Sequence, residues 1–125
     1  MKLIKILFVI LPTLIFTQNS LNIESSKRVY YYNSEFEQTD SINASYFKKV
    51  SFNSDFIPKG PIYLYTNDGA LISKTYASYF KAKFGKTDSI IKNGPLIKFF
   101  LNKKKSSIEF FINNIQIGNK FNYNE

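Results

Sequence analysis

The chain has 125 residues, a formal net charge of +8, and neither histidine nor cysteine. Without these two residue types, the usual zinc sites, cysteine and serine–histidine nucleophiles, and acid–base catalysis by imidazole are excluded. The length suits one domain, and an exported chain of this size must fold without disulfides.

The N-terminal stretch, residues 1–18, has the outline of a secretory signal peptide. Lys2 and Lys5 precede an apolar run over 6–16, and polar residues follow. That run is shorter than the roughly 20 residues that a membrane-spanning helix requires, although an uncleaved anchor is the alternative. We expect cleavage after Gln18 and export to the periplasm, the cell envelope or the medium.

A polar leader follows at 19–27, and it lacks any periodicity, so we expect it to be flexible. The folded domain is predicted to cover 28–125. Its first strand is expected at 28–32, followed by a polar connection at 33–43. The next segment, 44–52, alternates as a half-buried strand does, and its mostly apolar face consists of Tyr46, Lys48, Val50 and Phe52.

The rest of the chain is organised around two similar stretches. Residues 60–76 read GPIYLYTNDGALISKTY and residues 94–110 read GPLIKFFLNKKKSSIEF, each a predicted strand, turn and strand. Asp68-Gly69 suits a tight hairpin turn, whereas the second turn, at 102–105, lacks a glycine and is expected to be looser. A third unit starts near the C-terminus, and the glycines that start or turn the units are Gly60, Gly69, Gly94 and Gly118.

The segment between the two copies, 76–92, has aromatic residues whose spacing fits a helix or a strand, and the strand is favoured. A turn is expected at 85–88. Gly85-Lys86-Thr87 resembles part of a phosphate-binding loop, but that loop needs a second glycine where Phe80 stands. A nucleotide site is therefore not predicted.

These units resemble the MORN repeat, in particular the exported, Bacteroidetes-type variant of the bacterial MORN-repeat family. Segments 29–32, 44–52 and 58–60 are similar to the lead-in of such proteins, and the resemblance covers 28–123. It implies an all-β fold, an elongated antiparallel sheet of repeated β-hairpins. It also implies an interaction scaffold rather than an enzyme, and some bacterial relatives have antitoxin or immunity roles. The second turn without glycine and the truncated last unit depart from the pattern.

The carboxylates offer little chemistry. Asp55, Asp68 and Asp88 each lie beside a turn residue, where a structural role is the default. Paired catalytic carboxylates would have to converge in a cleft. We therefore predict no catalytic, cofactor-binding or metal-binding residues, and no enzyme activity.

Lysines cluster at two places, Lys48-Lys49 and the run Lys103, Lys104 and Lys105. The first interpretation is that they keep strand edges and turn tips soluble. The alternative is that the run contacts an anionic surface, such as phospholipid headgroups or acidic polysaccharide, with an attraction that falls with salt. Nucleic acid is not an expected partner, since export separates the chain from it.

The predicted function is thus that of an exported, non-catalytic scaffold for protein–protein interaction, with an antitoxin-like or immunity-like role as one variant. The alternative is a peripheral binder of anionic lipid or polysaccharide at the cell envelope. A small enzyme is the third hypothesis, and it would require a cleft with convergent polar groups.

Overall fold

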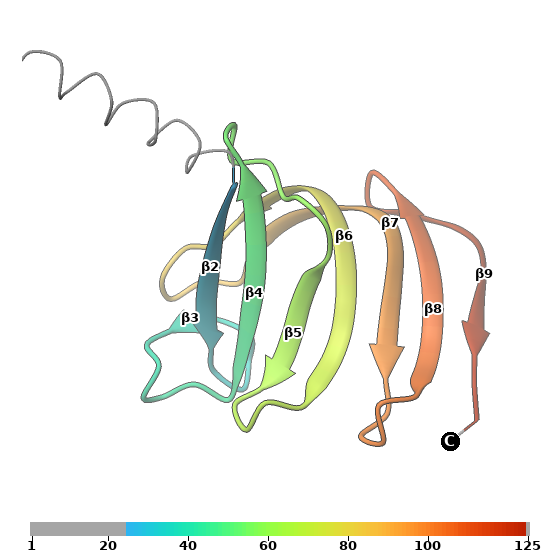
Figure 1. Cartoon of the computed structure of the whole chain (residues 1–125), viewed down its shortest axis with the longest axis horizontal. Coiled ribbons are helices and arrows are strands. Elements are labelled where there is room, and N and C mark those ends of the chain that lie inside the picture. The colour runs from blue at the N-terminus through green and yellow to red at the C-terminus, as the bar shows by residue number, and fades with distance from the viewer. Residues whose placement is uncertain (1–24, 125) are drawn as a thin grey trace, which may run out of the picture.

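The computed structural model describes residues 25–124 of the chain. In this range one eight-stranded antiparallel sheet has the strand order β3-β2-β4-β5-β6-β7-β8-β9 (Figure 1). The predicted all-β fold of antiparallel hairpins is confirmed. The predicted signal peptide, 1–18, lies outside the described residues. The strands are β2 (Ser25–Tyr32), β3 (Gln38–Thr39), β4 (Tyr46–Asn53), β5 (Ile62–Thr66), β6 (Leu71–Lys81), β7 (Ser89–Phe99), β8 (Lys105–Ile112) and β9 (Ile115–Asn122).

Several strand boundaries differ from the expected ones. β2 begins at Ser25, so the last residues of the predicted leader belong to the sheet. The favoured strand in 76–92 is confirmed, because β6 continues to Lys81 and β7 starts at Ser89. The two repeat-like stretches are therefore joined by one long β6–β7 hairpin.

The sheet curls so that the loop after β6 meets β3. Its register shifts twice in β6, between Thr75 and Ala77 and between Ala77 and Tyr79, and such irregularities bend a strand. Figure 1 shows the far half of β6 curving behind β2 and β4. The loop after β6 then reaches β3, where the Gln38 N–H donates to the Lys86 carbonyl at 2.9 Å. The sheet thus has an inner face and an outer face.

The core lies on the inner face. Its buried members are Val50, Phe52, Ile62 and Phe80, from β4, β5 and β6. The Phe80 ring centroid lies 5.3 Å from that of Tyr30 and 6.2 Å from that of Phe52. The alternation predicted for 44–52 is confirmed, since Val50 and Phe52 point inward. Burying one such side chain stabilises a fold by roughly 1.5 to 3 kcal/mol. The curl allows a single sheet to bury these side chains against itself.

Four turns share one hydrogen-bond pattern. The N–H of the first residue donates to the carbonyl of the fifth, and the N–H of the fourth donates to the carbonyl of the first. The fourth residue has a positive φ, as in a type I turn followed by a left-handed residue. These turns span 33–37, 53–57, 66–70 and 100–104.

The second hairpin turn, at 100–104, was expected to be looser than the turn at 66–70. Instead its two bonds, 2.8 and 2.9 Å long, match those of the first turn. Lys103 has a φ of 72° at the position that Gly69 occupies in the first turn. The hydrogen bonds therefore set this geometry without a glycine.

The predicted turn glycines have different positions. Gly69 lies in the β5–β6 turn, and Gly60 lies shortly before β5. Gly94 and Gly118 need correction, because they lie within β7 and β9 and not in turns. Gly94 has a φ of +119°, and a Cβ added to it would lie 3.0 Å from the Tyr76 Cβ. It lets β7 pass close to β6 where the sheet bends.

We expect Gly94→Ala to destabilise the fold more than Gly118→Ala. Both glycines have positive φ, which costs an L-residue about 1 to 3 kcal/mol. Only position 94 adds a clash with Tyr76, since a Cβ at position 118 meets nothing within 4 Å. Urea midpoints of the two variants measure the difference. Equal midpoints would mean that Tyr76 moves aside at no cost.

Candidate functional site

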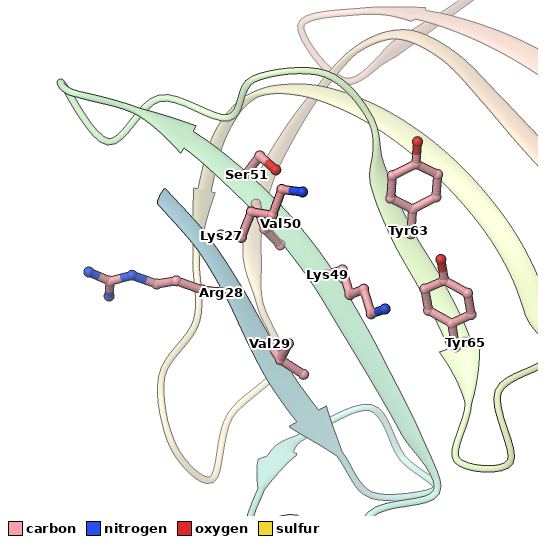
Figure 2. Close-up of a pocket in the computed structure, with 8 residues that line it drawn as sticks. All are labelled: Lys27, Arg28, Val29, Lys49, Val50, Ser51, Tyr63 and Tyr65. Carbon is pink, nitrogen blue, oxygen red and sulfur yellow. The ribbon is translucent and has the colours of Figure 1, made fainter. Parts of the chain in front are cut away.

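A groove of about 320 Å³ crosses the outer face over β2, β4 and β5. The register places Val29, Lys49 and Tyr63 opposite one another on these three strands. Figure 2 shows Tyr63 and Tyr65 rising side by side from β5, while the Arg28 side chain extends away. We call this feature the outer groove, and its lining includes Lys27, Val29, Lys49, Tyr63 and Tyr65.

Lysines and aromatic rings alternate around the outer groove. The Lys49 Nζ lies 5.3 Å from the Tyr65 ring centroid, and Tyr65 stacks on Phe47 at 5.0 Å. The Lys74 Nζ lies 5.7 Å from the Tyr63 ring centroid. Each cation–π contact contributes about 0.5 to 1 kcal/mol at an exposed site. The rings thus hold positive charge beside flat apolar surface.

A second exposed feature is the edge formed by β8 and β9. All eight residues of β9 are exposed. Apolar side chains gather on its outer face, because Ile117 pairs with Phe110 and Phe121 pairs with Ile108. Ile115 and Phe121 are 68% and 53% exposed. We call this feature the β9 edge, and apolar patches of this kind mark interaction sites.

Two other parts of the sheet edge are covered. The outer side of β3 is bonded to the β6–β7 loop through Gln38. The far half of β7 is bonded to the β8–β9 turn, where the Lys92 N–H donates to the Asn114 Oδ1 at 2.7 Å. The Asn114 side-chain amide also donates to the Ile90 carbonyl at 3.1 Å. β9 is the long exposed strand at the end of this sheet, and no strand among residues 25–124 pairs with its outer side.

A polar group lies beneath the inner face. Asp88 accepts hydrogen bonds from the Tyr32 hydroxyl at 2.8 Å and from the Lys48 Nζ at 2.7 Å. The Asp88 side chain is only 5% exposed, so a substrate has little access to it. Burial, and then the charge of Asp88 and the hydrogen bond to it, raise the pKa of Tyr32 far above its usual range. This group joins β2 and β4 to the start of β7.

The three aspartates considered in the sequence analysis do not lie together in one cleft. Asp55 lies in the 53–57 turn, Asp68 lies in the 66–70 turn, and Asp88 lies inside the curl. The hydroxyl of Thr66 is the main cause that lowers the pKa of the Asp68 carboxyl. The lysine run is exposed: Lys103 and Lys104 lie in the β7–β8 connection, and Lys105 is the first residue of β8.

Comparison with family models, curated proteins and solved structures finds no match to this chain. The resemblance to MORN repeats therefore stays a prediction. No helix within the described range is long and apolar enough to cross a bilayer.

Sequence reasoning missed the residues that define both exposed features. The β9 edge depends on a two-residue turn at Asn113 and Asn114, both with positive φ. An asparagine pair between two apolar runs is a hairpin signal of the type I′ class and could have revealed this strand pair. Lys49, Tyr63 and Tyr65 lie together because of the register between β4 and β5. No short sequence pattern indicates that register.

Tyr32→Phe should lower the free energy of unfolding by about 1.5 to 3 kcal/mol at neutral pH, because it removes a buried hydrogen bond to a charged group. The folded-state pKa of Tyr32 is raised, so its contribution is complete below the unfolded value of about 10 and decreases as pH rises above it. The variant should therefore lose less stability between pH 9 and 11 than the wild type. Urea titrations at pH values of about 9 and 11, on either side of the ordinary tyrosine pKa, measure this difference.

Tyr79→Phe is the matched control, because Tyr79 is 44% exposed. It should keep the alkaline loss of the wild type. An unchanged alkaline loss in Tyr32→Phe would contradict the role assigned to the buried hydroxyl.

Proposed function

We propose that this chain is an exported, non-catalytic scaffold that binds another protein through the β9 edge. One observation carries the proposal: β9 combines an open backbone edge with an exposed apolar outer face. An extended segment can add to such an edge through main-chain hydrogen bonds, while alternate side chains give specificity. Export is supported by the sequence of residues 1–18.

The chemistry of the edge also describes the partner. Ile115, Ile117 and Phe121 favour apolar side chains on the outer side of an added strand. Lys120 alternates with Phe121 in β9 and favours an acidic residue on the other side. The partner segment we propose is thus extended, with apolar and acidic residues in alternation. An antitoxin or immunity role is a variant in which this partner is a toxin.

Ile117→Lys should abolish partner binding, because it places a charge in the apolar row without removing a core residue. Ile42→Lys is the matched control, since Ile42 is 89% exposed in the loop before β4. Each variant is used as bait in envelope extract from cells that make the protein, and recovered chains are cross-linked and mapped. We expect a cross-link to β9 that survives in Ile42→Lys and is lost in Ile117→Lys.

Recovery of the same proteins by both variants, or cross-links that avoid β9, would overturn the proposed surface. Circular dichroism of each bait shows that it is folded.

The second candidate function is binding of an acidic polysaccharide in the outer groove. Lys27 and Lys49 provide positive charge there, and Tyr63 and Tyr65 provide flat rings beside it (Figure 2). Stacked rings next to cations suit sugar rings that carry carboxylates better than they suit a lipid headgroup. Lys103, Lys104 and Lys105 are a proposed additional contact with an anionic surface.

Polygalacturonate is the probe for this candidate, and neutral pullulan is its control. Lys49→Gln should weaken retention on polygalacturonate, whereas Lys59→Gln, an exposed lysine outside the groove, should not. Retention should fall with salt. Equal effects of the two variants would indicate a general charge attraction, and binding to anionic vesicles alone would favour a lipid surface.

A further inference from the structure

A pocket of about 190 Å³ lies on the inner face, where the sheet begins to curl. Its polar lining consists of Lys48 from β4, Ser73 and Thr75 from β6, and Lys92 from β7. The register explains why the two hydroxyl side chains share this face: Ser73 pairs with Leu64, and Thr75 pairs with Ile62. We call this the inner pocket. It is separate from both exposed features, since it lies on the opposite face of the sheet from the outer groove and away from β9.

Ser73 indicates that the inner pocket is suited to a polar ligand. Ser73 is 7% exposed as a residue. Among residues 25–124 its hydroxyl has no side-chain hydrogen bond, whereas Lys48 in the same lining bonds to Asp88. A buried hydroxyl without a partner destabilises a fold, so such groups call for an explanation. A polar ligand atom in the inner pocket would provide the missing partner.

The charge of the lining favours an anion. Lys48 is neutralised by Asp88, at 2.7 Å. Lys92 has no ion pair among the described residues, and its Nζ lies 4.5 Å from the Phe111 ring centroid. Glu109 pairs with Leu96 across β7 and β8, but it is not part of the lining. The net positive charge therefore comes from Lys92, and the two hydroxyls can donate to the same anion.

The remaining lining is apolar and belongs to β5 and β7. Its side chains are those of Ile62, Leu64, Ile90 and Leu96. Inorganic phosphate would leave these side chains without a contact. A small ligand with an anionic head and a branched aliphatic tail would use both halves of the lining. The volume is well below the roughly 300 to 1,000 Å³ of sites for drug-sized ligands.

We propose that the inner pocket binds a short-chain aliphatic carboxylate. The ammonium group of Lys92 pairs with the carboxylate, Ser73 and Thr75 donate hydrogen bonds to it, and the aliphatic chain lies against Ile62 and Leu96. This site is independent of the proposed protein-binding function, because none of its residues belongs to the β9 edge.

Sodium isovalerate is the probe, and its titration is followed by amide chemical shifts at constant ionic strength. We expect saturable shifts confined to residues around the inner pocket. Isovaleramide, which has the same shape without the charge, should produce no such shifts. Phosphate should bind at least about tenfold more weakly than isovalerate, because it cannot use the apolar lining.

Lys92→Gln should weaken isovalerate binding about tenfold or more, since it removes a charged hydrogen-bond donor. Lys86→Gln is the matched control, because Lys86 is an exposed lysine of the β6–β7 loop and does not line the inner pocket. Ser73→Ala should weaken binding while leaving the urea midpoint of the free protein equal or higher, as it removes an unpartnered hydroxyl.

Three results would overturn the proposal. They are shifts spread over the exposed lysines, phosphate binding as tight as isovalerate binding, and equal weakening by Lys92→Gln and Lys86→Gln. A lower urea midpoint in Ser73→Ala would also count against it, because Ser73 would then have a structural partner. None of these results bears on β9.

Discussion

The curl of the sheet is the constraint on which the rest of this structure depends. In residues 25–124 no helix or second sheet covers the apolar face, so the sheet must cover itself. The irregular pairing of β6 with β7 permits this, because it carries Phe80 beneath β2 and β4. The same bend delivers Asp88 to Lys48 and Tyr32. An apolar contact and an ion pair thus hold the far end of the hairpin in one place.

Much of the local structure could be predicted from the sequence. The alternation in 44–52 gave β4 and its buried face, and the Asp68-Gly69 turn gave the β5–β6 hairpin. These signals are local, because side-chain alternation and turn chemistry act over a few residues. The strand preference predicted within 76–92 is also confirmed, since β6 continues to Lys81 and β7 starts at Ser89.

The curl of the sheet, the outer groove and the inner pocket could not be predicted from such local signals. Asp88 bonds to Lys48 at a sequence separation of 40 and to Tyr32 at a separation of 56. The residues next to Asp88 in the sequence therefore do not indicate its partners. Gly94 read as the start of a hairpin unit, but its positive φ serves a close approach of β7 to Tyr76 inside the sheet. The outer groove and the inner pocket depend on which residues face each other across several strands.

A local sequence signal also accompanies two of the turns. The turns at 33–37 and 53–57 both begin with Asn-Ser, an acidic residue and Phe. In each turn the asparagine side-chain oxygen accepts from two backbone N–H groups, as at Asn53, where Asp55 and Ile57 donate. Phe36 and Phe56 consequently take left-handed φ values of 63° and 60°. In these two turns the asparagine cap, and not the identity of the fourth residue, accompanies the conformation.

The covered edges have a consequence for assembly. β3 is closed by the β6–β7 loop, and Asn114 bonds to the far half of β7 with its side-chain amide, much as a strand residue would. At these two places the backbone is already bonded, so addition of a strand is directed to the apolar edge at β9. Growth into a fibre needs two complementary open surfaces on each subunit. Pairing of two copies through β9 alone would use the same surface on both subunits, which gives a closed pair with no β9 edge left for further growth.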